Sequence, residues 1–206
     1  MTERFSAPYR GYDVLDKWDT PSFNDQTRRV LRGRMDPPPR RFFSDTEWRV
    51  LLSLCARAMP QPERTDPVAI APFIDADLHT GRGTGTRRAD MPEPGAAWRR
   101  GLAALDAEAV ARHGCGFADL DGPAADAILR AVDSGDLADP AAWEGLPAQR
   151  FLRETALKHI VSIYYSQPQG MSEIGYGGPA SPRGYVRLGT DRIDPWEAPH
   201  GQWPDR

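Results

Sequence analysis

The stretch SDTEWRVLLSLCARAM, residues 44–59, decides the fold class of this chain. Ser44 and Glu47 have the spacing of a capping box, in which each side chain bonds the backbone amide of the other residue. Apolar residues then recur at helical spacing, which predicts one buried helix face. They are Trp48, Leu51, Leu52, Cys55 and Met59. Pro60 follows and ends the predicted helix.

Helical patterns recur on both sides of this stretch. Ser22 and Asp25 give a weak capping signal for a short helix that ends near Met35. Downstream, a second apolar face predicts a helix that contains Ile70, Phe73, Ile74 and Leu78. A longer helix follows, with Gly114 placed just after its end. Its apolar positions are Trp98, Leu102, Leu105 and Ala109.

Two more helices are expected in the second half of the chain. Asp121 caps the first, and Ile128, Leu129 and Val132 point inward. The second covers about residues 147–166 and is apolar nearly all the way round, so we expect it to be buried on most faces. Pro168 stops it. Because no run of alternating strand pattern occurs, the predicted class is all-α.

Glycine and proline divide the chain into three expected parts. The 20 prolines and 19 glycines among 206 residues lie mainly between the helical patterns. We expect an N-terminal arm with one short helix over residues 1–41, a small helical domain over 42–168, and an irregular Gly/Pro-rich tail over 169–206. The formal charge of −3 does not indicate a nucleic-acid-binding protein. No stretch approaches the roughly 18 apolar residues that span a membrane.

Two features bear on the cellular location. Residues 1–10 lack the apolar run of a secretory signal. The sequence TRRVLR at 27–32 looks like a twin-arginine export signal, but no hydrophobic region follows it. We therefore expect a cytoplasmic protein, periplasmic only if it is exported with a partner.

The sequence predicts no catalytic, cofactor-binding or metal-binding residue in this chain. Residues 81–85, GRGTG, follow a predicted helix and have the wrong spacing for a dinucleotide loop. The four histidines are scattered, and no two lie four residues apart on one helix as a metal site would favour. They are His79, His113, His159 and His200.

The tail from Tyr164 onward combines aromatic residues with many glycines. Tyr, Trp and Arg are the side chains that commonly anchor interfaces, and glycine allows another surface to approach closely. We therefore expect this tail to bind a partner protein. The alternative is that it folds back over its own helices. The expected interface residues are Tyr164, Tyr165, Glu173, Tyr176, Gly177, Gly178, Pro179, Arg183, Gly184, Tyr185 and Trp196.

At these residues the chain resembles subunit 3 of gluconate 2-dehydrogenase, the small subunit of flavin-dependent sugar dehydrogenases. The resemblance is carried by the tyrosine pair at 164–165, by YGG at 176–178, and by RGYVRLG at 183–189, where many members carry GWKLIG. It extends upstream to about residue 42, through FFS at 42–44 and GLAALDAEA at 101–109. Residues 11–30 resemble the arm of a branch of this family that carries no signal.

The resemblance implies a division of labour between subunits. The chemistry would lie in a large flavoprotein of the glucose–methanol–choline oxidoreductase type, which carries FAD and oxidises a sugar or polyol. Electrons would leave through a cytochrome c in many such complexes. The small subunit would fold, stabilise or export the large one and would supply no catalytic residue and hold no cofactor itself.

Two other functions remain open at this point. The chain could be a stand-alone small helical enzyme or ligand-binding protein, with a pocket near His159, Tyr164 and Tyr165. It could also be an assembly chaperone that leaves the mature complex.

Overall fold

The computed structural model describes residues 9, 11–62, 64–83, 88–179 and 194–198. None of these residues forms a strand, and the all-α prediction is confirmed. No helix in the described ranges is both long and apolar enough to cross a membrane. The chain divides into two compact units, which we call the helical unit, residues 38–163, and the terminal unit, residues 1–37 with 164–206. The expected three-part division stays a prediction.

The helical unit begins with α2, Asp45–Ala58, which confirms the predicted capping box. Ser44 Oγ accepts a hydrogen bond from the Glu47 amide at 3.3 Å, and the Ser44 amide donates to Glu47 Oε2 at 2.8 Å. The predicted burial of Leu52 is wrong, because its side chain is 46% exposed. The buried residues are Val50, Leu51, Leu54 and Cys55. The buried face therefore centres on Leu51 and Leu54, and Leu52 lies about 100° round the helix from Leu51.

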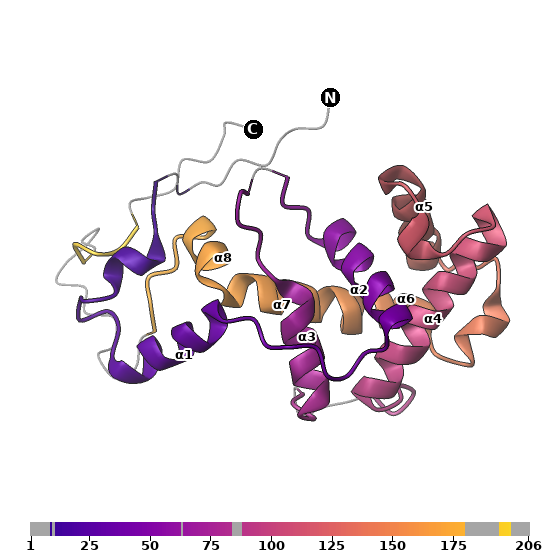
Figure 1. The fold of residues 1–206 in the computed structure, drawn as a ribbon, viewed down its shortest axis with the longest axis horizontal. Helices are drawn as coiled ribbons and strands as arrows, with labels where there is room; N and C mark the ends of the chain where they lie inside the picture. The colour runs from indigo at the N-terminus through magenta and orange to yellow at the C-terminus, as the bar shows by residue number, and fades with distance from the viewer. Residues whose placement is uncertain (1–8, 10, 63, 84–87, 180–193, 199–206) are drawn as a thin grey trace. The chain divides into compact units, whose positions relative to one another are not determined.

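Two further helices complete the first half of this unit. Helix α3, Ile70–His79, buries Ile70, Ile74 and Leu78 as predicted. Helix α4, Pro94–His113, runs beside α2 (Figure 1) and buries Trp98, Leu102, Leu105 and Ala109. It ends at Gly114, whose φ of +73° is the left-handed conformation expected of a helix-ending glycine.

The second half of the helical unit contains short elements around one more regular helix. The 3₁₀ turn η2, Phe117–Asp119, precedes α5, Gly122–Ser134, where Asp121 caps as predicted by accepting from the Ala124 amide. A second 3₁₀ turn, η3, spans Pro140–Trp143. The expected helix over 147–166 is three consecutive elements: α6, Ala148–Arg150, the π-helix η4, Phe151–Leu157, and α7, Lys158–Ser166.

Large aromatic side chains fill the core of the helical unit. The Trp98 ring meets the Phe43 ring edge-on at 6.3 Å and the Phe151 ring edge-on at 5.8 Å. Phe151 packs directly on Gly101, where an added Cβ would overlap the phenyl ring. Helices α4 and η4 can approach this closely only because residue 101 has no side chain. Val161 is 39% exposed, so the prediction that the 147–166 helix is buried on most faces holds less well toward its end.

Two fully buried carboxylates hold the connecting segments of the helical unit. Asp75 accepts hydrogen bonds from the amides of residues 41–43. Glu108 accepts from the amides of Ala138 and Asp139 and from Trp143 Nε1. Buried backbone amides outside helices need such acceptors. Both acids are therefore explained by the fold.

The terminal unit is built from both ends of the chain. The N-terminal part contributes the 3₁₀ turn η1, Val14–Lys17, and α1, Asp25–Met35; the C-terminal part contributes α8, Pro168–Glu173. Helices α1 and α8 lie side by side in this unit (Figure 1). Asn24 caps α1 by accepting from the Thr27 amide, whereas the predicted cap, Ser22, is buried. Pro168 ends α7 but also begins α8, so the first residues of the tail are helical rather than irregular.

Candidate partner-binding site

A small apolar cluster joins the two ends of the chain within the terminal unit. Its buried members are Val14, Phe23, Leu31 and Met171, and the rings of Tyr12, Trp18 and Tyr176 pack against them. The Val14 amide also donates to Ser172 Oγ at 3.0 Å. Residues more than 130 positions apart in the sequence are therefore held together by both apolar and polar contacts. We call residues 11–35 the N-terminal segment and residues 164–179 the C-terminal segment.

The backbone of the Tyr176-Gly177-Gly178 motif is bonded by side chains of the N-terminal segment. Tyr12 OH donates to the Tyr176 carbonyl at 2.8 Å, and Lys17 Nζ donates to the same oxygen at 2.5 Å. Ser22 Oγ donates to the Gly177 carbonyl at 3.3 Å. These carbonyls would otherwise need water or another partner. Both ends of the chain thus share one hydrogen-bond network at this motif.

Gly178 is required by this packing for two reasons. Its φ is +96°, a backbone conformation that residues with a side chain rarely adopt. A Cβ at this position would also overlap Ser22 Oγ. At Gly177, by contrast, the one atom of the described residues near an added Cβ would be Glu197 Oε1, at 3.6 Å. One glycine of the pair therefore has a clear structural role, and the other is spatially tolerant.

Lys17 is a buried cation in an aromatic surrounding. Its side chain is 1% exposed, and Nζ lies 5.4 Å from the Tyr12 and Phe23 ring centroids and 5.8 Å from that of Tyr176. Burial lowers the pKa of Lys17 to about 8, and the negative charge of Glu197 opposes this shift. Burial likewise raises the pKa of Tyr12 to about 12. The aromatic rings and one carbonyl stabilise the ammonium group incompletely, which leaves a titratable group inside this unit.

The tyrosine pair lies at the α7–α8 turn. Tyr164 is buried, and its hydroxyl donates to Glu173 Oε1 at 2.6 Å. The Tyr164 and Tyr165 rings pack edge-on, with centroids 5.0 Å apart. Burial, followed by the charge of Glu173, raises the pKa of Tyr165. The structure therefore brings together three of the expected interface residues, Tyr164, Tyr165 and Glu173. Tyr164 and Glu173 use this hydrogen bond within the chain rather than with a partner.

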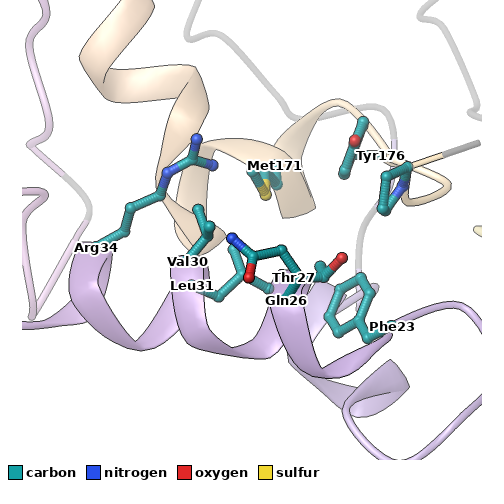
Figure 2. Close-up of a pocket in the computed structure, with 9 residues that line it drawn as sticks. Phe23, Gln26, Thr27, Val30, Leu31, Arg34, Met171 and Tyr176 are labelled. Carbon is teal, nitrogen blue, oxygen red and sulfur yellow. The ribbon is translucent and has the colours of Figure 1, made fainter. Parts of the chain in front are cut away.

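An apolar groove runs between α1 and the C-terminal segment, as Figure 2 shows. Its volume is about 210 Å³. Val30 forms part of its wall and is 41% exposed, and Arg34 extends from α1 at one end of it. The groove is lined by Phe23, Gln26, Thr27, Val30, Leu31, Arg34, Met171, Tyr176 and Pro179.

The other predicted residues have mixed outcomes. Pro179 lines the groove, and Trp196 is half-buried. Arg183, Gly184 and Tyr185 lie outside the described residues. Whether a partner contacts any of the expected interface residues stays a prediction.

The three residues of the alternative pocket each have a local partner or role in packing. His159 Nε2 lies 3.2 Å from Asp77 Oδ2, and the His159 ring meets the Trp98 ring edge-on at 5.9 Å. Neither His159 nor the tyrosine pair lines the groove. Within the described ranges, no three His, Cys, Asp or Glu side chains gather where they could hold a metal ion.

Sequence reasoning missed Tyr12, Lys17 and Ser22, which bond the glycine motif. A signal for Tyr12 was present, because Tyr12, Trp18 and Phe23 make the otherwise polar N-terminal segment unusually aromatic. The role of Lys17 had no local signal, since a lone lysine in a polar stretch normally lies at the surface. Its burial depends on residues about 160 positions away.

Comparison with protein families gives one match. The family model for gluconate 2-dehydrogenase subunit 3 matches residues 45–178. The match ends at Gly178, so it includes the whole Tyr-Gly-Gly motif but leaves out the N-terminal segment that bonds it. Searches of curated proteins and of solved structures each found no match.

Proposed function

This chain belongs to the gluconate 2-dehydrogenase subunit 3 family, and we propose that it is the non-catalytic small subunit of an FAD-dependent sugar or polyol dehydrogenase. The family is one of subunits, so the chain works in a complex with other subunits. We further propose that its main partner is a large flavoprotein of the glucose–methanol–choline type. That partner would hold the FAD and the catalytic residues, and a cytochrome c would take up the electrons in some complexes.

The observation that carries this proposal is the surface of the terminal unit. The C-terminal segment is the end of the region that matches the family, and it forms one wall of an apolar groove. Val30 of this unit is a large apolar side chain that is 41% exposed and lines the groove. Exposed apolar side chains beside a groove are typical of protein–protein contact sites. A role in binding and stabilising another subunit uses these features directly.

Co-expression with the flavoprotein of a neighbouring gene tests this function. We expect the flavoprotein to be recovered folded, FAD-loaded and active with this chain, and to be largely insoluble or without FAD when expressed alone. Purified chain added after expression separates help during folding from later stabilisation. A flavoprotein that folds, binds FAD and turns over equally well alone would contradict the proposal. So would dehydrogenase activity of the purified single chain.

Size-exclusion chromatography of the active complex distinguishes a permanent subunit from a transient chaperone. We propose a permanent subunit, which elutes with the flavoprotein and its activity. Elution of the active flavoprotein without this chain would instead identify an assembly chaperone. The cytoplasmic location stays a prediction that cell fractionation would test.

A further inference from the structure

The groove between α1 and the C-terminal segment has the size of a side-chain site. Small-molecule sites usually enclose about 300–1,000 Å³, whereas this groove has a volume of about 210 Å³. It is too small for a flavin or a similar cofactor but can take one or two large apolar side chains. Its walls are mostly apolar, with Phe23, Leu31 and Met171 at their base. An apolar side chain of a protein matches this volume and this lining.

Arg34 adds a charge requirement at one end of the groove. Its guanidinium group is half-buried and donates to the Ser166 carbonyl at 2.9 Å. Among the described residues, no carboxylate lies within ion-pair distance of Arg34. Burial lowers the pKa of Arg34, as expected for a cation that has lost part of its water. A guanidinium has five N–H donors, so donors remain for a carboxylate at this end.

The charge of α1 discriminates between possible occupants. Helix α1 carries four arginines and one aspartate, a formal charge of +3, in a chain whose total is −3. Residues 180–193 follow the groove residue Pro179 in sequence, but they carry three arginines and one aspartate and have the same sign of charge. A second copy that presents its own α1 to this groove would bring a helix of the same sign. An acidic partner is favoured over both.

We infer that this groove binds a segment of the large subunit in which a bulky apolar side chain lies beside an Asp or Glu. The apolar side chain enters between Val30 and Met171, and the carboxylate pairs with Arg34. This is the geometry of groove recognition by apolar anchors, with one charge pair that fixes orientation. The inference rests on the proposed function, because it specifies how the flavoprotein is held.

The test uses Val30→Glu in the full chain, with binding to the flavoprotein measured against the wild-type chain. A glutamate at residue 30 lies four residues before Arg34 on α1 and can pair with it. It would therefore replace the apolar wall of the groove with a charge and would compete with the partner's carboxylate for Arg34. We expect the dissociation constant to rise at least about tenfold, the effect typical of blocking an anchor site. Val110→Glu, at a side chain 51% exposed on α4, is the matched control and should change affinity less than about twofold.

Cross-linking keeps the test decisive even if Val30→Glu disturbs α1. Val30→p-benzoylphenylalanine in the complex should cross-link to an acidic, apolar peptide of the flavoprotein. Cross-links to residues 180–193 of the same chain, to a second copy, or to no protein would overturn the inference. So would Val30→Glu binding as tightly as wild type. If one of these results is found but the wild-type chain still forms a stable complex with the flavoprotein, only the inference about the groove is wrong. If the wild-type chain forms no complex at all, both this inference and the proposed function are wrong.

Discussion

The helical unit and the terminal unit are stabilised in different ways. The helical unit buries large side chains completely, with Trp98, Phe151 and Trp143 in ring contact. The terminal unit has four buried apolar residues in its cluster and depends on side chains that bond the carbonyls of Tyr176 and Gly177. Burial of apolar area is the larger source of stability. We therefore expect the terminal unit to open more easily, as partner-binding regions commonly do.

The two units also differ in how far apart in the sequence the residues lie that determine their structure. The helices of the helical unit carry caps and apolar positions that can be read from residues a few positions apart, although the helices then pack against others far away in the sequence. The terminal unit forms only when residues 11–35 meet residues 164–179. Bringing these two segments together closes a long loop of chain, and the entropy cost of closing a loop rises with its length. The comparison thus predicts distinct responses of the two units to substitution and to pH.

The largest expected effect is that of Gly101→Ala on the helical unit. The added methyl group would overlap the buried Phe151 ring, whose surroundings of Trp98 and Trp143 leave little room for it to move. We expect the free energy of unfolding to fall by about 2–4 kcal/mol. Overpacking a core costs about 1–3 kcal/mol, and more where the neighbouring side chains cannot move. Labelling of the Cys55 thiol measures it, because Cys55 is buried and burial raises its pKa to about 12, so it reacts only after opening.

Gly33→Ala is the control for this prediction. No atom in the described part of the chain lies within 4 Å of a Cβ at residue 33 of α1, so alanine there should stabilise the helix by about 0.5–1 kcal/mol. Equal labelling rates of Cys55 in Gly101→Ala and the wild-type chain would show that the core of the helical unit is not packed as described.

Gly178→Ala should have the next largest effect, confined to the terminal unit. Alanine is strained at a φ of +96°, and its methyl group would displace Ser22. We expect a loss of about 2 kcal/mol, which is about a thirtyfold larger population of the open form. Tryptic cleavage after Lys17 measures this population, because Lys17 is buried when the unit is closed.

Gly177→Ala is the matched variant, since among the residues that the structure describes its Cβ would meet only Glu197 Oε1, at 3.6 Å. Its tryptic cleavage rate should stay within about threefold of the wild-type rate. If both alanine variants were cleaved at the same rate, Gly178 would not have the structural role that distinguishes it from Gly177.

A smaller effect is expected from pH, again in the terminal unit. The folded state releases the Lys17 proton near pH 8, whereas the unfolded state holds it up to about 10.5. The unfolded state therefore binds more protons between these values, and stability rises as the pH increases from 8. Between pH 7.5 and 9.5 the gain should be about 1–2 kcal/mol. Tyr12 titrates at about 12 in the fold and at its usual 10 when unfolded, so it opposes the gain only above pH 10.

Urea unfolding of the terminal unit, followed by the ¹⁹F resonance of Trp18 in fluorotryptophan-labelled protein, measures this pH dependence. Lys17→Met removes the titrating group and keeps an apolar side chain of similar length. Its stability should be flat between pH 7.5 and 9.5. A wild-type chain that loses stability over this range, or a Lys17→Met chain that gains as much as wild type, would contradict the assignment.

The helical unit was largely predictable because its signals are local. The Ser44–Glu47 box, the cap at Asp121 and the left-handed Gly114 each depend on residues a few positions apart. Leu52 was misplaced because a helix with apolar residues on adjacent positions does not fix which way its face points. The π-helix over Phe151–Leu157 depends on packing and leaves no pattern in the sequence.

The terminal unit was less predictable because its contacts are distant in sequence. The sequence shows the Tyr-Gly-Gly motif. It does not show that the carbonyls of this motif accept hydrogen bonds from Tyr12, Lys17 and Ser22. The groove needs α1 and α8 together, and α8 begins at a proline that also stops the preceding helix. The two alternatives for the tail, binding a partner and folding back over its own chain, do not exclude each other. Residues up to Pro179 pack within their own chain and still form the wall of an open groove.

Hydrogen–deuterium exchange of the chain, alone and bound to the proposed flavoprotein partner, tests the central claim most directly. If the terminal unit holds the partner, binding should slow exchange by at least about tenfold in residues 25–35 and 168–179. The core of the helical unit, residues 97–109, should change little, because its amides are already protected by burial. Slower exchange confined to residues 45–163, with none in the terminal unit, would contradict the account.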